Sequence, residues 1–215
     1  MLLRKANVVD GAMRFLDAEG LDALTMRKLG ATLNVQGGAL YRHFPNKEAL
    51  LDAMADKILE GVAGSLPDVA WDEQIFVLCD RLRTSMLAHR DGARVVSGTY
   101  SPGVNTIAGT DTAIQILCRA GAAPAQAGWL TFALFYYVLG HTIEEQALSE
   151  LPADDDWRSR NARRAVDASA EYAAALDSLT STDPAKRFAY GLRTFLDGIA
   201  GQIVTDQARP HQTIG

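Results

Sequence analysis

Residues 24–47 read LTMRKLGATLNVQGGALYRHFPNK, a stretch that predicts two short helices joined by a tight turn. The first helix is expected to begin at Thr25, because a threonine side chain caps a helix start well. It is expected to end near Asn34, because asparagine tolerates the left-handed backbone that a tight turn needs. The second helix is expected over residues 38–44, where Pro45 ends it. The apolar residues that would hold the pair together are Leu29, Leu33, Val35 and Leu40.

Helical spacing of apolar residues continues on both sides of this stretch. A preceding helix is expected over residues 5–18, with Gly20 as its stop, and a following helix is expected from its cap, Asn46, toward Gly64. The sequence shows no strand-like alternation beyond a few residues, so the fold class is expected to be all-α. Further helices are expected over residues 71–89, 104–120, 125–149, 162–179 and 185–204.

Helix breakers divide the chain into four expected parts. Pro67 and Asp68 mark a loop that separates an N-terminal head from a larger body. The expected parts are a three-helix helix-turn-helix domain over residues 1–46, a connecting helix over 47–66, a body over 67–207 and a tail over 208–215.

Charge is distributed unevenly over the 215 residues, whose formal net charge is −5. Residues 1–50 contain seven Lys and Arg against five Asp and Glu, so this part carries +2 and the rest of the chain −7. Nucleic-acid binding depends on basic groups that meet phosphates. A mildly basic head on an acidic body is therefore typical of a protein that offers one end to DNA.

Composition indicates a cytoplasmic protein with no membrane partner. Hydrophobic residues make up 48% of the chain, yet no stretch approaches the roughly 20 apolar residues of a membrane span. The N-terminus carries charges where a secretion signal would be apolar. Cys79 and Cys118 are therefore expected to be reduced thiols.

The pattern LTMRKL, then L-x-V, then LYxHFxNK within residues 24–47 resembles the DNA-binding region of the TetR family of transcriptional regulators. The resemblance implies a helix-turn-helix whose second helix enters the major groove of double-stranded operator DNA. It also implies that Arg27 reaches a base or a phosphate from the helix that begins at Thr25. The residues implied as DNA contacts are Thr25, Arg27, Gln36, Gly37, Gly38, Ala39, Tyr41, Arg42, His43 and Lys47.

Two glycines at the start of the recognition helix set this sequence apart from the tetracycline repressor, which carries larger groups there. Gly37 and Gly38 have no side chain to offer to a base. Direct base readout is therefore expected from Arg27, Gln36 and Arg42, with arginine to guanine as the strongest contact. The operator is not expected to be the tetracycline operator.

The resemblance extends into the body. Four segments resemble the ligand-binding domain of the tetracycline-repressor subgroup, namely HRDGARV (89–95), GT (98–99), GHTIEEQ (140–146) and FAYGL (188–192). In that subgroup two helices form a four-helix bundle with their copies, which implies a homodimer and a palindromic operator here. The helices that match are 125–149 and 185–204. A small-molecule inducer would then release the DNA by shifting the connecting helix.

The magnesium site of the tetracycline repressor is incomplete in this sequence. That repressor binds its drug as a magnesium chelate held by two histidines and a glutamate. The glutamate position matches Glu144, whereas the histidine positions fall on Ala63 and Val96. One carboxylate provides too few donors for a hard cation. No metal and no cofactor are therefore expected, and tetracycline with magnesium is not the expected inducer.

An apolar cavity with a few polar groups is the expected ligand site, with Glu144 as its polar anchor. The candidate wall residues are Leu82, Met86, Val96, Thr99, Tyr100, Ile116, Trp129, Phe132, Phe135, Tyr136 and His141.

Several of these residues have a purely structural alternative. Tyr41 either contacts DNA or packs against the first helix, and His43 either contacts phosphate or caps and packs. Phe44 is expected in the core. Each residue of the candidate wall has the alternative of an ordinary core or dimer contact, and His141 is expected to be a hydrogen-bonded helical histidine.

Two other classes of function compete with a DNA-binding repressor. An enzyme is disfavoured because the sequence holds no Ser/His/Asp or Cys/His set, no glycine-rich phosphate loop after a strand and no metal-ligand cluster among its four histidines. A small-molecule-binding helical protein without DNA binding is favoured by the paired glycines and the small positive charge of the head. Salt-sensitive binding to DNA would distinguish the repressor from it.

Overall fold

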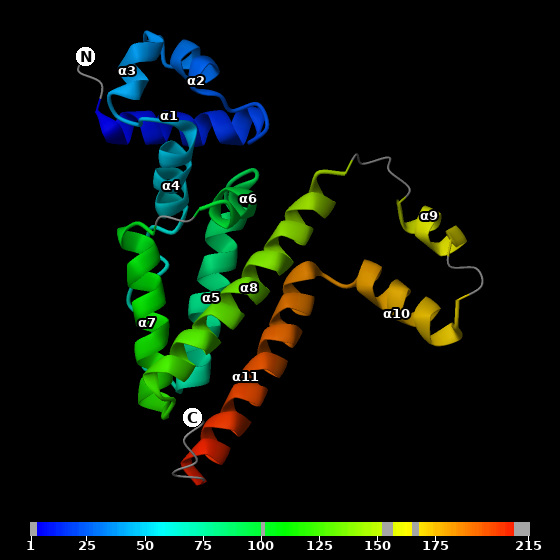
Figure 1. Ribbon diagram of the computed structural model, residues 1–215. Coiled ribbons are helices and arrows are strands. Elements are labelled where there is room, and N and C mark those ends of the chain that lie inside the picture. The colour runs from blue at the N-terminus through cyan, green and yellow to red at the C-terminus, as the bar shows by residue number, and fades with distance from the viewer. Residues whose placement is uncertain (1–3, 100–101, 152–156, 165–167, 209–215) are drawn as a thin grey trace, which may run out of the picture.

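The computed structural model describes residues 4–99, 102–151, 157–164 and 168–208, and every regular element among them is an α-helix. Three short helices form the head, and the next helix leads from it into a larger helical body (Figure 1). The head consists of α1 (Lys5–Glu19), α2 (Met26–Thr32) and α3 (Gly37–Tyr41), and the connecting helix is α4 (Lys47–Ile58). The all-α class and the helix-turn-helix expected from the sequence are confirmed.

Polar side chains set the helix limits in the head. The Thr25 hydroxyl accepts a hydrogen bond from the Lys28 amide at 3.2 Å, and the side-chain oxygen of Asn46 accepts one from the Ala49 amide at 2.8 Å. Each bond satisfies an amide that has no partner inside its own helix. Asn34 takes the left-handed conformation, with φ of 52°, in the turn between α2 and α3. All three features agree with the sequence.

The head has an apolar core, and α4 closes it from below (Figure 1). Its fully buried side chains include Leu16, Leu29, Leu40, Phe44 and Met54. The connecting helix ends at Ile58 rather than near Gly64. Turns follow it because Gly61 has φ of 83°, a conformation that a helix interior excludes.

Five helices make up the main part of the body. The long helices α8 and α11 lie side by side, and α6 packs against both α4 and α8 (Figure 1). The sequence did not predict α6, since six residues are too few to show a helical period. The bounds are α5 (Trp71–Leu87), α6 (Gly92–Ser97), α7 (Val104–Ala120), α8 (Pro124–Ser149) and α11 (Pro184–Ala208).

The buried side chain of Gln146 on α8 fixes the start of α6. Its oxygen accepts a hydrogen bond from the Ala93 amide at 3.0 Å, and its nitrogen donates to the carbonyl oxygens of Met86 and His89 at 3.1 and 2.8 Å. Gly92 lies so close to the end of α5 that a Cβ there would be 2.2 Å from the Met86 carbonyl oxygen. Only glycine permits this approach.

The expectation of one helix over residues 162–179 is wrong. The chain instead forms α9 (Trp157–Arg164) and α10 (Ala170–Ser181), which lie beyond α8 and α11 at the edge of the molecule (Figure 1). The Ser169 hydroxyl accepts a hydrogen bond from the Tyr172 amide at 3.1 Å and so caps a new helix start. Within the described ranges, no helix is both long and apolar enough to cross a membrane.

A largely buried ion pair joins α5 to α8. The Arg83 guanidinium donates to the Glu145 carboxylate through Nε at 2.9 Å and Nη2 at 2.5 Å. The two side chains are only 9% and 15% exposed. The guanidinium carbon also lies 5.2 Å from the centre of the Phe188 ring of α11. The pair therefore ties together three helices of the body.

Replacing Glu145 with alanine is expected to lower the free energy of unfolding by about 3 to 5 kcal/mol, because it leaves the Arg83 charge buried and unpaired. Urea denaturation at fixed protein concentration measures this loss. Glu150→Ala is the control: its carboxylate is exposed and 4.0 Å from Arg90, so its loss is expected to cost less than about 1 kcal/mol. Equal losses for the two variants would contradict the role given to the buried pair.

Candidate functional site

The head presents a polar surface along α2, the turn and α3. The residues expected to contact DNA all lie in this segment or at the start of α4. Those that are exposed are Thr25, Arg27, Gln36, Gly38, Tyr41 and Arg42, and those that are partly buried are Ala39, His43 and Lys47. Gly37 is the first residue of α3. The basic side chains of this set are thus available to a partner.

The two aromatic residues of this segment take different positions. Phe44 is buried in the head core, as expected, with the Lys5 ammonium 5.0 Å from its ring centre. Tyr41 is 54% exposed, so packing against α1 does not account for it. The start of α3 is also open: a methyl group added at Gly38 would meet no atom within 4 Å.

A polar junction fixes the head to α6. The Asp91 carboxylate accepts hydrogen bonds from the Leu21 amide at 2.7 Å and from Arg94 at 2.6 Å. Arg94 also donates to the Asp22 carboxylate at 2.8 Å. Leu21 and Asp22 follow α1, whereas Asp91 and Arg94 belong to the start of α6. Movement of α6 would therefore act directly on the head.

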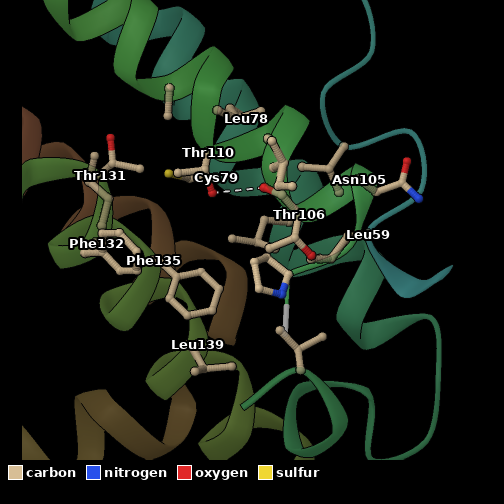
Figure 2. A pocket seen from close by; sticks show the side chains of 18 of the residues that line it. Leu59, Leu78, Cys79, Asn105, Thr106, Thr110, Thr131, Phe132, Phe135 and Leu139 are labelled. Carbon is tan, nitrogen blue, oxygen red and sulfur yellow. Dashed lines mark hydrogen bonds between the residues drawn. The ribbon is translucent and has the colours of Figure 1, made fainter. Parts of the chain in front are cut away.

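The body contains an apolar cavity of about 650 Å³ next to the junction of α4 and α6, open to solvent near Phe132 and Tyr136, which are 52% and 63% exposed. Its walls come from α4, α5, α7 and α8 and from the end of α6. Figure 2 shows the rings of Phe132 and Phe135 of α8 on one side and Thr106 of α7 on the other. Leu78 and Cys79 of α5 also line the cavity. A cavity of this size and composition suits a small organic molecule.

The structure brings about half of the candidate wall residues to this cavity, namely Leu82, Val96, Thr99, Phe132, Phe135 and Tyr136. Met86 and Ile116 are fully buried in the core but do not line the cavity. Trp129, His141 and Glu144 are not among the residues that line this cavity. Tyr100 lies outside the described residues.

Sequence reasoning missed the first turns of α7. Asn105, Thr106 and Thr110 line the cavity, together with Thr131 of α8. The spacing of Thr106 and Thr110 by four residues places both on one helix face, which could have indicated them. Aromatic residues drew the expectation to α8 instead, because large apolar side chains are the usual lining of ligand sites.

An aspartate of α4 binds the start of α7 beside the cavity. One oxygen of Asp56, Oδ1, accepts hydrogen bonds from the main-chain amides of Asn105 and Thr106 at 2.8 and 3.1 Å. The other, Oδ2, accepts from the Asn105 side chain at 3.1 Å. A Cβ at Gly103 would come within 2.2 Å of the Asp56 carboxyl carbon, so this contact depends on glycine. The head-bearing helix is therefore bonded to the cavity wall.

His141 lies in a cluster with Glu145 and Phe188 rather than at the cavity. Its Nδ1 atom is 3.6 Å from the Glu145 carboxylate, too far for a hydrogen bond, and is buried without a partner in the described part of the chain. Burial lowers the pKa of His141 below its usual value, and Glu145 only partly opposes this. The expectation of a hydrogen-bonded histidine is therefore wrong for this nitrogen.

The helices α8 and α11 carry apolar side chains that the described part of the same chain leaves uncovered. Trp129 of α8 is 77% exposed and Tyr190 of α11 is 78% exposed. Gly140 of α8 and Gly198 of α11 have open space around them and no side chain, so another helix can approach closely there. Such an apolar face on two adjacent helices suits association with another copy.

Among the described residues, no group of three or more His, Cys, Asp and Glu could hold a metal ion.

Two family models match the chain. The model of bacterial regulatory proteins of the tetR family matches residues 8–54, and the model of the tetracyclin repressor-like C-terminal domain matches residues 63–203. A class A tetracycline repressor protein from transposon 1721 of Escherichia coli is 35% identical over 92% of this chain and 91% of that protein.

Solved structures resemble the chain over almost its whole length. A possible TetR family transcriptional regulator from Streptomyces coelicolor A3(2) has a TM-score of 0.84 and 39% identity, over 92% of this chain and 99% of that chain. The protein ActR from Streptomyces coelicolor, in complex with (S)-DNPA, has a TM-score of 0.80 and 28% identity, over 94% of this chain and 98% of that chain. The protein BioQ with its natural double-stranded DNA operator has a TM-score of 0.68 and 33% identity, over 93% of this chain and 99% of that chain.

The thiol of Cys79 is expected to be unreactive although it faces the cavity. Desolvation by burial, helped by the charge of Asp80, raises its pKa from 9.0 to about 12. In a Cys118→Ala variant, alkylation by iodoacetamide near pH 8 is therefore expected to be roughly 10³-fold slower in the folded protein than in denaturant. The Cys79→Ala variant, which keeps the half-buried Cys118, is the control and should lose far less of its rate on folding. Similar losses for both thiols would contradict the prediction.

Proposed function

Because the chain belongs to the tetR family of bacterial regulatory proteins, we propose that it is a transcriptional repressor that binds operator DNA through its head and releases it when a small molecule occupies its body. The observation that carries this proposal is the head surface around α2 and α3, which leaves Arg27, Gln36 and Arg42 exposed together. The related proteins BioQ and ActR, solved with operator DNA and with a small molecule, support the two halves of the proposal.

The proposed reading head uses few side chains. Arg27 and Arg42 are long cations that can reach guanine edges or phosphates, and Gln36 can bond an adenine edge. Gly37 and Gly38 leave the start of α3 bare, so the helix backbone can approach the groove closely. Tyr41 and Lys47 would then hold phosphates and fix the register of the head.

We propose a homodimer that covers the apolar faces of α8 and α11. Burial of Trp129 and Tyr190 in a partner surface would remove large aromatic areas from water. Two-fold symmetry would present two heads to a palindromic operator whose half-sites are roughly 34 to 36 Å apart, or a multiple of this.

Two routes connect the cavity to the head. Val96 of α6 lines the cavity, and Arg94 of the same short helix bonds Asp22 of the head. Asp56 of α4 is bonded to Asn105 and Thr106, which also line the cavity. A ligand that displaces α6 or the first turn of α7 would therefore move α4 and change the separation of the heads. Coupling of about 1 to 3 kcal/mol is typical of such proteins.

Two other functions fit less well. The relatives are transcriptional regulators, so we propose a cytoplasmic regulator without catalytic activity rather than an enzyme. A ligand-binding protein that has lost DNA binding remains the competing proposal, because α3 begins with two glycines. Its affinity for duplex DNA would be weak and independent of sequence.

Replacing Arg27 and Arg42 together with alanine is expected to weaken binding to the intergenic DNA beside the protein's own gene by roughly 100-fold, because each arginine contributes a base or phosphate contact. Fluorescence anisotropy of a labelled duplex at fixed salt measures this effect. Arg119→Ala, at an exposed position near the end of α7, is the control and should leave the affinity unchanged. An unchanged affinity of the double variant would refute the proposed reading head.

Magnesium is not expected to increase the affinity of this protein for tetracycline. Val96 on the cavity wall offers no donor atom, Ala63 lies off the wall, and Glu144 is an exposed carboxylate. A hard cation would therefore lack the ligands it needs. Tetracycline fluorescence titrations with magnesium and with EDTA should give the same curve. A clear gain in affinity with magnesium would show that the chelate binds through groups other than these.

A further inference from the structure

We infer that the body cavity selects apolar molecules that donate hydrogen bonds, either uncharged or cationic, and rejects carboxylates and other anions. This inference rests on the proposed function in one respect, which is that the cavity is the effector site. It follows from where each polar group of the wall directs its hydrogen atoms.

The threonine hydroxyls of the wall give their protons to their own helices. Thr110 donates to the carbonyl oxygen of Thr106 at 2.9 Å, a bond drawn in Figure 2, and Thr131 donates to that of Ala127 at 2.8 Å. Thr99 donates to the carbonyl oxygen four residues before it at 2.9 Å. A carbonyl oxygen can only accept, so each hydroxyl must be the donor and has only lone pairs left for a ligand.

The side chains of Asn105 and Thr106 at the start of α7 also use their hydrogens within the protein. The Asn105 side-chain nitrogen directs its two hydrogens to Asp56, to the carbonyl oxygen at 3.0 Å and to Oδ2 at 3.1 Å. The Thr106 hydroxyl donates to Oδ1 of Asp56 at 3.4 Å. What these two side chains can still offer is the Asn105 oxygen and the Thr106 lone pairs, which all accept.

The helix start that could have held an anion is already occupied. The N-terminus of a long helix attracts negative charge through its unpaired amides and its dipole. In α7 the amides of Asn105 and Thr106 are bonded to the Asp56 carboxylate. The protein has thus placed its own anion at this site, and a ligand carboxylate would meet a like charge there.

The charges of the cavity wall also disfavour an anionic ligand. Among the described lining residues there is no Lys, Arg or His, and the one charged residue is Asp111, a carboxylate. The Cys79 thiol is a weak donor. Tyr136 is the strongest remaining donor of the lining, but it is 63% exposed. An anion entering this apolar space would lose its water without gaining a cation, which is costly.

The ligand must therefore bring its own protons. A phenol, alcohol or amine can donate to the threonine oxygens and to Asn105, whereas a ligand that only accepts would leave lone pairs unpaired on both sides. An ammonium group would also be attracted by the carboxylates of Asp111 and Asp56.

Four pyrene derivatives test this selectivity, because they share one apolar ring system and differ in a single group. They are 1-hydroxypyrene, 1-methoxypyrene, 1-pyrenemethylamine and 1-pyrenecarboxylate, titrated near neutral pH into the full-length protein and followed by fluorescence anisotropy. The expected result is that 1-hydroxypyrene binds roughly tenfold more tightly than 1-methoxypyrene, since one hydrogen bond is at stake. The amine should bind at least as tightly as the ether, and the carboxylate should bind most weakly.

Variants connect the selectivity to the wall. Thr131→Val and Thr110→Val each remove one acceptor at nearly constant volume and should reduce the preference for 1-hydroxypyrene over 1-methoxypyrene, while the affinity for the ether stays unchanged. Thr32→Val is the matched control, because Thr32 makes the same hydrogen bond to the carbonyl oxygen of Lys28 at 3.1 Å but lies in the head. Circular dichroism checks that each variant folds. If Thr131→Val, at the more buried position on α8, does not fold, Thr110→Val on α7 still provides the test.

The outcomes separate this inference from the proposed function. The inference is overturned if 1-methoxypyrene or 1-pyrenecarboxylate binds as tightly as 1-hydroxypyrene, if 1-hydroxypyrene does not bind, or if neither threonine variant changes the preference. A parallel anisotropy assay follows release of the intergenic duplex. The expected selectivity without any release would count against ligand-controlled DNA binding alone, whereas release by the carboxylate would support that function and overturn the selectivity.

Discussion

The three hydrogen bonds of the buried Gln146 side chain hold the chain at the place where cavity, connecting helix and head meet. They fix the end of α5 and the first turn of α6 to α8, next to Gly92, where a Cβ would come within 2.2 Å of the Met86 carbonyl oxygen. From this point α6 extends Arg94 and Asp91 toward the head and Val96 toward the cavity. Gln146 thus holds the start of the short helix, and a shift of this helix would be felt both at the head and at the cavity.

The connecting helix receives a second, independent constraint from Asp56. Its carboxylate replaces the missing intrahelical partners of two amides at the start of α7, so separating α4 from α7 would leave these amides unpaired. The same residue accepts both side-chain hydrogens of Asn105, one at its carboxylate and one at its main-chain carbonyl oxygen, and thereby sets the chemistry of the cavity. One residue therefore serves the transmission of movement and the selection of the ligand.

The sequence predicted the head far better than the body. Thr25 and Asn46 act through bonds within a few residues, and Asn34 acts through its own left-handed backbone, so this local chemistry is visible in a sequence. The start of α6 depends on Gln146, more than fifty residues away, and no periodicity shows this. Apolar spacing placed Met86 and Ile116 on the inside but could not tell core from cavity, while Trp129 proved to face outward. The role of the wall threonines depends on the direction of a single proton, which only the packed helices define.

The bare start of α3 has a consequence for the evolution of this protein. Because no neighbouring atom restricts position 38, substitutions there would not disturb the scaffold that supports them. The DNA sequence that the head recognises can therefore change while stability and assembly stay constant. A duplicated copy of the gene could acquire a separate set of targets through one or two codon changes, long before its response to small molecules has diverged.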